Sequence, residues 1–338
     1  MDKFKNIPVF VAHKGCPNTC VFCNQKKISG AKDEVNEKAL RQMLSSSVMN
    51  CVPHKTQIAF FGGSFTGITP DAMEKYLSIA NEYVLKYGLN GIRLSTRPDY
   101  IAGGILDILK KYNVKTIELG VQSMDDRVLS LNERNMTSKT IKEASKLILK
   151  NGFNLGIQLM TSMYGSNFET DIYSAMEVVK LKPHFVRIYP TVVIPETKLF
   201  ELYNKGIYKT RTLEETVKVS SEMLEIFLKN NIDVIRIGLM TNEDINCEKV
   251  IGAYHPAFGE LVFGAYYLKI IKSLIFGKTK GRLLIINAPK ELVSKISGHK
   301  KENINKLKEE FGFLDIKFHY DDEISVKIVE VKRENEKS

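Results

Sequence analysis

The segment Cys16-Pro17-Asn18-Thr19-Cys20-Val21-Phe22-Cys23 determines how the rest of this 338-residue chain is interpreted. It directly follows an apolar stretch, residues 7–11, that is typical of a buried strand, so one tight loop presents three thiols. Four cysteines would close a zinc or iron–sulfur site, whereas three leave a metal position open for chemistry. The spacing favours a metal centre held by Cys16, Cys20 and Cys23. The alternatives are a zinc site completed by a distant His or Cys, and three unrelated buried thiols.

The composition limits the class of protein. No stretch has the length of uninterrupted apolar residues that a membrane span needs, and no long apolar segment follows the N-terminal lysines, as a signal peptide would require. Three of the five cysteines are clustered, which is typical of a reducing compartment where thiols bind metals. We therefore expect a cytoplasmic protein with no membrane partner, in which Cys51 and Cys247 are packed side chains.

The charge of the chain bears on its partners. A formal net charge of +10 indicates polyanionic partners, nucleic acid above all, because lysine and arginine neutralise phosphates. The alternative is a lysine-rich surface with no binding role. Charge alone leaves RNA binding open.

Strand and helix patterns alternate along the first two-thirds of the chain. Short apolar runs predict strands at residues 7–11, 58–61, 92–95, 116–121, 155–160, 185–189 and 234–239, with helical periodicities between them. Such alternation implies a parallel sheet with helices outside it, whose working residues sit at the carboxyl ends of the strands. The cysteine loop, the pair Gly62-Gly63 and Gln122 all fall at such ends.

The cysteine loop, with the aromatic Phe22 before its last cysteine, resembles the cluster loop of the radical S-adenosylmethionine (SAM) enzymes. The resemblance implies a partial (β/α)6 barrel and a [4Fe–4S] cluster on Cys16, Cys20 and Cys23. It also implies that SAM chelates the open iron. One electron, from a donor such as flavodoxin or ferredoxin, would then split SAM into methionine and a 5′-deoxyadenosyl radical.

The same resemblance implies the contacts of SAM. Gly62-Gly63-Ser64 occupies the place of the glycine motif whose backbone receives the SAM amino group, and glycine allows that close approach. By match to the motifs Glu118-Leu-Gly-Val-Gln122-Ser and Leu-Asn-Glu-Arg134, the glutamine hydrogen-bonds SAM and the arginine pairs with its carboxylate.

Two positions depart from the patterns of the related enzymes. Ser95, in Ser95-Thr-Arg-Pro-Asp, stands where the Elongator-type segment has glutamate, which removes a charged acceptor. Gln158 stands where oxygen-independent coproporphyrinogen oxidases carry an aspartate, and it remains able to hydrogen-bond a ribose. We predict both residues, together with Phe22, as cofactor contacts.

Later segments favour the Elongator catalytic subunit over the porphyrin branch. They are Arg187-Ile-Tyr-Pro, Pro195-Glu-Thr-Lys-Leu, Arg236-Ile-Gly and His255-Pro-Ala-Phe-Gly-Glu260, so the likeness spans about residues 5–265. The cysteine spacing differs from that subunit, and no segment resembles its acetyltransferase domain, so we expect chemistry without acetyl transfer. For His255 and Glu260, a contact with substrate and a capping role are both open.

The C-terminal segment, residues 281–338, changes character. Its predicted order of strand, helix, loop, helix and strand resembles a KH domain, whose Gly-x-x-Gly loop clamps nucleic-acid backbone. The matching loop is Gly298-His-Lys-Lys301, so lysine replaces the second glycine and adds charge. The alternatives are a cap on the barrel and a dimerisation element. We therefore divide the chain into a radical-SAM barrel with its extension, residues 1–280, and a small KH-like domain with a charged tail.

The favoured hypothesis is a radical SAM enzyme that modifies RNA, with tRNA as the expected substrate. A small-molecule radical SAM enzyme of the coproporphyrinogen oxidase kind is the second hypothesis. The third is a protein without enzymatic activity, which uses an iron–sulfur cluster for RNA binding or electron transfer. The apparent SAM pocket at Gly62-Gly63 and Gln122 argues against it.

Overall fold

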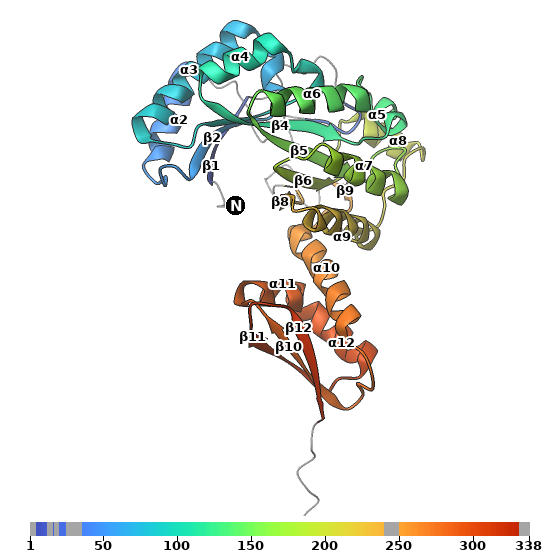
Figure 1. Cartoon of the computed structure of the whole chain (residues 1–338). Coiled ribbons are helices and arrows are strands. Elements are labelled where there is room, and N and C mark those ends of the chain that lie inside the picture. Colours follow the sequence, from blue (N-terminus) through green and yellow to red (C-terminus); the bar gives the residue numbers. More distant parts are fainter. Residues whose placement is uncertain (1–4, 12–15, 17–19, 25–35, 240–249, 331–338) are drawn as a thin grey trace, which may run out of the picture.

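A computed structural model describes residues 5–11, 16, 20–24, 36–239 and 250–330 (Figure 1). Cys247 and the charged tail lie outside the described residues. A curled parallel sheet forms the larger part of the molecule, with strands in the order β1-β2-β3-β4-β5-β6-β8. The strands are β1 (Lys5–Phe10), β2 (Thr56–Phe61), β3 (Ile92–Thr96), β4 (Val114–Gln122), β5 (Asn154–Thr161), β6 (Phe185–Pro190) and β8 (Asp233–Ile237).

The sheet confirms the predicted α/β barrel and corrects its strand count. Seven strands are hydrogen-bonded in one sheet, rather than the six of a (β/α)6 barrel, because β8 pairs in parallel with β6. All seven strands lie where apolar runs predicted them, within a few residues. The short strands β7 (Val192–Val193) and β9 (Ile251–Gly252) form a separate two-stranded ladder.

Helices cover the outer face of this sheet, as Figure 1 shows. They are α2 (Glu37–Val48), α3 (Pro70–Tyr87), α4 (Gly103–Lys111), α5 (Asp126–Leu131), α6 (Ser138–Lys150), α7 (Phe168–Lys180) and α9 (Leu213–Lys229). The short helix α8 (Lys198–Asn204) packs instead beside the cysteine loop, through Leu199. Two helix ends lie where the sequence predicted them: α3 begins after Thr69, with Pro70 in its first turn, and α6 ends at Asn151. Apolar side chains such as Ile117 and Leu119 fill the layer between sheet and helices.

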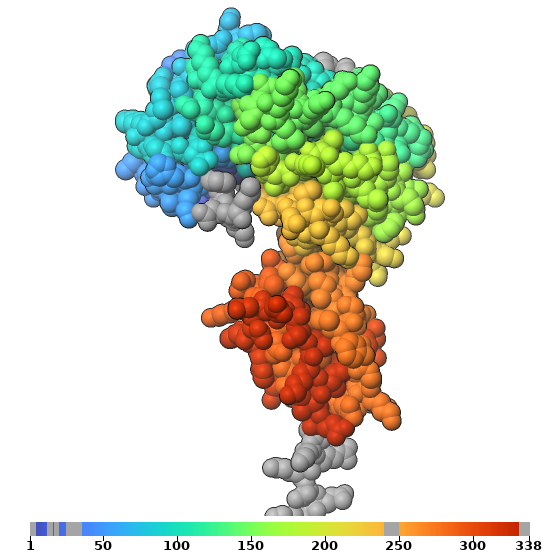
Figure 2. Space-filling view, viewed as in Figure 1, coloured from blue at the N-terminus to red at the C-terminus, as the bar shows by residue number. Residues whose placement is uncertain are grey.

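A smaller C-terminal unit follows the barrel. Helix α10 (Phe258–Leu274) leads into β10 (Arg282–Ala288), α11 (Val293–Ser297), α12 (Glu302–Phe311), β11 (Asp315–Tyr320) and β12 (Ser325–Glu330). The central β10 is parallel to β11 and antiparallel to β12. The predicted order of two strands and two helices is confirmed, and β12 was not predicted. Figure 2 shows this unit, orange to red, projecting from the barrel.

Helix α10 belongs to two hydrophobic cores. Its first turns, with Phe258 and Val262, pack beside α9, and its later turns, with Tyr267 and Ile271, pack in the core of the C-terminal unit. This single helix therefore connects the two parts by packing on both. None of the described helices is both long and apolar enough to cross a membrane.

Candidate active site

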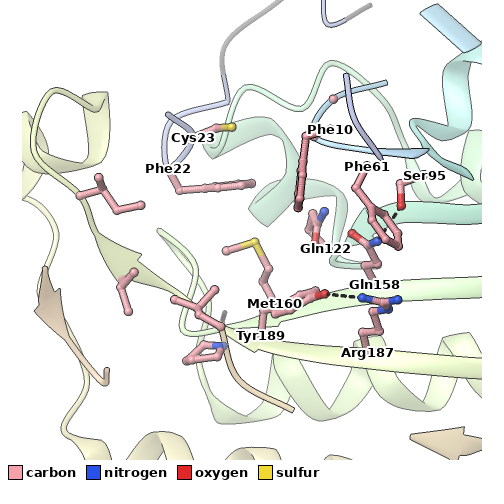
Figure 3. Close-up of a pocket in the computed structure, with 16 residues that line it drawn as sticks. Phe10, Phe22, Cys23, Phe61, Ser95, Gln122, Gln158, Met160, Arg187 and Tyr189 are labelled. Carbon is pink, nitrogen blue, oxygen red and sulfur yellow. Dashed lines mark hydrogen bonds between the residues drawn. The ribbon is translucent and has the colours of Figure 1, made fainter. Parts of the chain in front are cut away.

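A pocket of about 250 Å³ lies where the carboxyl ends of the barrel strands meet (Figure 3). Seven of the predicted cofactor or metal residues line it, namely Phe22, Cys23, Gly62, Gly63, Ser95, Gln122 and Gln158. These side chains come from five separate segments of the chain, so the fold alone brings them together. The structure thus joins most of the predicted site in one pocket.

The glycine pair forms one wall of the pocket immediately after β2. Gly62 has a φ of +92°, which side-chain-bearing residues rarely adopt, and a Cβ there would lie 3.5 Å from the Phe10 ring. Gly62 and Gly63 therefore leave their backbone open to close approach by a ligand.

Gln122, at the end of β4, has a strained backbone and an unsatisfied polar atom. Its φ is +71°, and the pairing of β4 with β5 shifts register between Gly120 and Gln122. Its Oε1 atom is buried and has no hydrogen-bond partner among the described residues. Strain of this kind concentrates at functional sites, and a buried acceptor calls for a donor. Gln122 is therefore suited to receive a hydrogen bond from a ligand in the pocket.

Two buried arginines lie beside the cysteines. Arg134 donates from Nη1 to the Cys20 sulfur at 3.2 Å and from Nη2 to the Gly120 carbonyl. Arg97 donates from Nη2 to the Arg134 carbonyl at 2.6 Å. Arg134 does not line the pocket, because its guanidinium group hydrogen-bonds the Cys20 sulfur. The contact with the SAM carboxylate that the sequence predicted stays a prediction.

The cysteines occupy different environments. Cys20 is buried, Cys23 lines the pocket, and Cys16 is exposed overall although protein atoms crowd its thiol. That partial burial raises the pKa of the Cys16 thiol, as does the neighbouring Cys20, while Arg97 and Arg134 act in the opposite direction. Among the described residues, no three His, Cys, Asp or Glu side chains converge tightly enough to hold a metal ion. The three-cysteine ligand set therefore stays a prediction.

Ser64 lies behind the pocket. It is fully buried; its hydroxyl lies 2.8 Å from the Thr96 hydroxyl and accepts a hydrogen bond from the Arg97 backbone N–H at 3.1 Å. Ser64 thus fastens the loop after β2 to the end of β3.

An ion network occupies the barrel interior behind the pocket. Glu118 is fully buried; Arg187 donates to it from Nη2 at 3.1 Å, and the Arg187 Nε atom lies 2.9 Å from its carboxylate as an ion pair. Arg93 lies 3.4 Å away. Gln158 donates both to Glu118, at 3.1 Å, and to the Ser95 hydroxyl, at 3.3 Å. Arg187 also contacts the Tyr189 hydroxyl, as Figure 3 shows. This network fixes the pocket-facing side chains of Gln158 and Arg187.

The two arginines of this network respond differently to the same carboxylate. Burial lowers the pKa of both, but Glu118 and Tyr189 raise that of Arg187 above its ordinary value, whereas the pKa of Arg93 stays lowered. The reason is geometric, since Arg187 makes two close contacts with Glu118 and Arg93 makes one longer contact. The network therefore holds two cations around one anion.

The far end of the barrel is packed shut. The Arg93 guanidinium lies 4.6 Å from the centre of the Phe185 ring. That ring occupies the space a Cβ at Gly156 would need, so only glycine fits there. Gln57 and Thr116 are also almost fully buried at this end.

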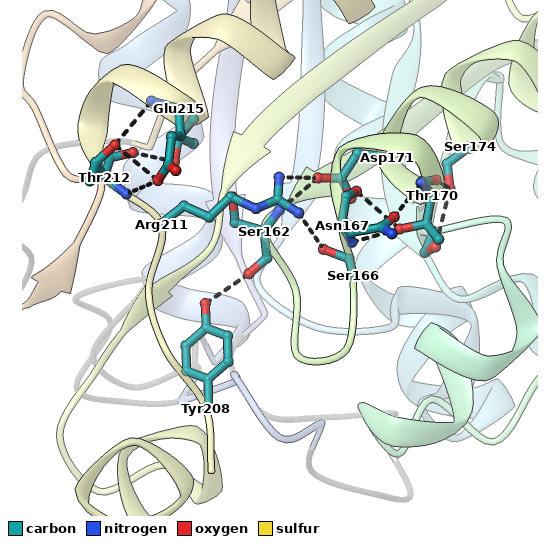
Figure 4. A network of polar contacts seen from close by, with 12 residues as sticks. Ser162, Ser166, Asn167, Thr170, Asp171, Ser174, Tyr208, Arg211, Thr212 and Glu215 are labelled. Atoms are coloured by element: carbon teal, nitrogen blue, oxygen red, sulfur yellow. Dashed lines mark hydrogen bonds and ion pairs between the residues drawn. The ribbon is translucent and has the colours of Figure 1, made fainter. Parts of the chain in front are cut away.

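A second polar network supports the loop after β5 (Figure 4). Arg211 pairs with the buried Asp171 at 2.9 Å, and Asp171 accepts a hydrogen bond from the Ser162 backbone N–H. The Tyr208 hydroxyl donates to the Ser162 carbonyl at 2.7 Å, and burial raises the Tyr208 pKa well above its usual range. Neither Arg211 nor Tyr208 lines the pocket, so we assign this network a structural role in holding the loop after β5.

Sequence reasoning missed the apolar wall of the pocket and the charges behind it. The wall consists of Phe10, Phe61, Met160, Pro190, Val192, Ile194 and Leu239. A usable signal existed for Arg93, Glu118 and Arg187, because each interrupts an apolar strand at an inward-facing position. Arg187 was noted only as part of a resemblance.

His255 and Glu260 lie at the start of α10, and neither lines the pocket. His255 accepts a hydrogen bond from the Ala257 N–H at 3.0 Å, so the capping alternative describes it. Its ring meets that of His299 edge to face at 5.3 Å, and His299 contacts Glu260 at 3.1 Å. The group joins the barrel to the C-terminal unit.

Two family models match the chain. That of the radical SAM superfamily covers residues 11–175, and that of the radical SAM C-terminal domain covers residues 183–266. The chain belongs to the radical SAM superfamily. It is therefore a radical SAM enzyme, and Elongator-type proteins are among its relatives.

Several named proteins are similar in sequence to this radical SAM enzyme. A tRNA uridine(34) acetyltransferase of Methanocaldococcus jannaschii is 32% identical over 139 residues, which are 40% of this chain and 26% of that protein. Elongator complex protein 3 of Schizosaccharomyces pombe is 29% identical over 175 residues, 51% of this chain and 32% of that protein. The matches thus span about a quarter to a third of these relatives.

The fold has a counterpart among solved structures. The archaeal Methanocaldococcus infernus Elp3 with an N-terminal deletion superposes with a TM-score of 0.62 at 20% identity, over 82% of this chain and 65% of that chain. At this identity the likeness establishes the fold alone. Superfamily membership implies a [4Fe–4S] cluster and SAM, and the residues present suit both. Three thiols beside two guanidinium groups suit an anionic cluster, and an open glycine backbone with a buried acceptor suits an amino-acid-containing cofactor.

Proposed function

We propose that this enzyme holds a [4Fe–4S] cluster through Cys16, Cys20 and Cys23, binds SAM beside it, and modifies tRNA. The observation that carries the proposal is the single pocket shared by Cys23, the pair Gly62-Gly63 and Gln122. When bound, the two cofactors supply the 5′-deoxyadenosyl radical by reductive cleavage of SAM.

The chain positions the reactants and excludes water. The open backbone at Gly62-Gly63 would receive the amino group of SAM, and the buried, unpaired Oε1 of Gln122 would accept a hydrogen bond from the cofactor. Gln158 and Ser95 present neutral polar atoms that suit a ribose. The aromatic and aliphatic wall keeps water from a reactive intermediate.

Support for tRNA as substrate comes from three sources. Relatives carry names that include tRNA uridine(34) acetyltransferase. The chain has a net charge of +10, which favours a polyanion. The third source is the loop between α11 and α12, where Lys300 and Lys301 follow Gly298.

That loop has a compact, strained backbone. Lys300 and Lys301 have positive φ angles of 51° and 62°, and a Cβ at Gly298 would lie 2.8 Å from the Asn303 side chain. Asn303 holds the turn by donating to the Gly264 and Ile296 carbonyls. In the proposal this loop contacts RNA phosphates, as in a KH domain.

The test is formation of 5′-deoxyadenosine by the anaerobically reconstituted protein with a strong reductant, with and without bulk tRNA. We expect formation that rises with tRNA and is absent in Cys20→Ala, which loses the visible absorbance of the cluster. Formation indifferent to tRNA would overturn the RNA substrate and favour a small metabolite. An intact cluster spectrum in Cys20→Ala would overturn the ligand assignment.

A further inference from the structure

Arg97 carries a buried donor that nothing in the described structure satisfies. The residue follows β3 directly and is only 4% exposed. Its Nε and Nη2 atoms each donate to the Asp99 carboxylate at 2.9 Å, and Nη2 also donates to the Arg134 carbonyl. Its Nη1 atom is buried without a hydrogen-bond partner among the described residues. Buried donors are rarely left unpaired, so Nη1 indicates a ligand.

The surroundings of Arg97 identify the nature of that ligand. Its side chain fixes the backbone of Arg134, whose own guanidinium rests on the Cys20 sulfur. Its backbone N–H binds the Ser64 hydroxyl, and the Ser64 backbone hydrogen-bonds the Cys16 thiol. Arg97 thus contacts both Ser64, which hydrogen-bonds the Cys16 sulfur, and Arg134, which hydrogen-bonds the Cys20 sulfur. As thiolates, both sulfurs favour the charged form of Arg97.

The charge balance at this position is positive. Arg97 and Arg134 contribute two guanidinium groups, and Asp99 is the single carboxylate that pairs with either within the described chain. Thiolates and a reduced iron–sulfur cluster are anionic, and hydrogen bonds and positive charge near the sulfurs favour the reduced state. The buried Arg97 guanidinium, with its unpaired Nη1, is therefore suited to stabilise the reduced cluster.

We propose that Arg97 tunes the cluster for reduction. Its Nη1 would donate a hydrogen bond to a sulfur atom on the Cys16–Cys20 side of the cluster, and this hydrogen bond would raise the reduction potential of the cluster. The inference rests on the proposed function, because it needs the cluster. It assigns to Arg97 a role different from substrate or SAM binding.

The experiment is a redox titration of the reconstituted full chain, without SAM, followed by electron paramagnetic resonance of the reduced cluster. In Arg97→Gln we expect wild-type iron and sulfide content and a more negative midpoint potential. At a fixed solution potential near the wild-type midpoint, the ratio of reduced to oxidised cluster should fall about tenfold, as loss of one charge-assisted hydrogen bond implies. Arg97→Lys keeps the charge and loses the forked donor, so its shift should be smaller and in the same direction.

Arg211→Gln is the matched control. It also removes a guanidinium group from a buried ion pair, with Asp171, but outside the surroundings of the cysteines. Its cluster should therefore keep the wild-type midpoint.

The outcomes separate the inference from the proposed function. A loaded cluster with unchanged midpoint in Arg97→Gln overturns the inference, above all if SAM affinity falls instead, because Arg97 would then serve the SAM carboxylate. If Arg97→Gln does not fold, an unchanged midpoint in Arg97→Lys overturns it equally. A wild-type protein that loads no [4Fe–4S] cluster overturns the proposed function itself.

Discussion

Replacing Glu118 by glutamine tests the ion network at the centre of the barrel. The substitution keeps the shape of the side chain and removes the only carboxylate found between Arg93 and Arg187 in the described structure. Glu118 is fully buried; it accepts hydrogen bonds at 3.1 Å from Arg187 Nη2 and from Gln158, and it forms an ion pair with Arg187 Nε at 2.9 Å. Two buried cations are then left without their counter-charge.

The expected cost follows from these contacts. Breaking a buried ion pair by removing one partner costs about 3–5 kcal/mol, because the remaining charge stays buried and uncompensated. Both arginines are at most about a tenth exposed, so water relieves little of this cost. We expect Glu118→Gln to lower the free energy of unfolding by about 4 kcal/mol.

Equilibrium unfolding in urea, followed by far-ultraviolet circular dichroism, measures this loss. The matched control is Glu133→Gln, which breaks the solvent-exposed pair with Lys198 and should cost less than about 1 kcal/mol. A loss below about 1 kcal/mol for Glu118→Gln as well would refute the reasoning, because the buried arginines would then not depend on the carboxylate.

Three further predictions concern the rest of the molecule. Burial, helped by His299 and Lys300, lowers the pKa of His255, so the folded protein binds fewer protons there than the unfolded chain; wild-type stability should fall as pH drops through about 6.5, and His255→Gln should lack this part of the loss. Lys300→Glu and Lys301→Glu should each weaken tRNA binding and reduce the slope of log affinity against log salt by roughly 1. Tyr208→Phe leaves the Ser162 carbonyl unpaired and should cost about 1–3 kcal/mol in urea unfolding, with an unchanged cluster spectrum.

Each of these has a result that contradicts it. If the free energy of unfolding varies with pH in the same way in wild type and His255→Gln, then His255 does not contribute to the pH dependence of stability. Salt slopes unchanged in both lysine variants would exclude the α11–α12 loop from the RNA contact. A fully stable Tyr208→Phe would show that water replaces the lost hydrogen bond.

The strands and the polar, glycine and cysteine residues of the pocket were predictable from sequence because their signals are local, whereas its apolar wall was not predicted. Apolar runs located every strand of the main sheet, the cysteine spacing located Cys23, and the place of Gly62 and Gln122 after strands, within motifs of related enzymes, located those two residues. Once the strands are parallel, their carboxyl ends must meet, so the pocket follows from the strand order. The superfamily was first indicated by the spacing of the three cysteines in one loop.

Other features depend on partners that sequence spacing does not reveal. Helix α10 is apolar on nearly every side because it packs in two cores, and this hides the periodicity that would mark a helix. Glu118 and Arg187 lie 69 positions apart, and only the curl of the sheet brings them together. Similarly, the contact of Arg134 with Cys20 joins two motifs across 114 positions.

The closed end of the barrel constrains the order of events in turnover. Because Phe185, Arg93 and Gly156 fill the end opposite the carboxyl ends of the strands, the pocket does not open through that end of the barrel. Under the proposed function, SAM would enter from the carboxyl ends of the strands, the same side from which a large substrate would approach. For the proposed tRNA substrate we therefore expect ordered kinetics, in which SAM binds first and excess tRNA slows turnover by delaying release of the SAM fragments.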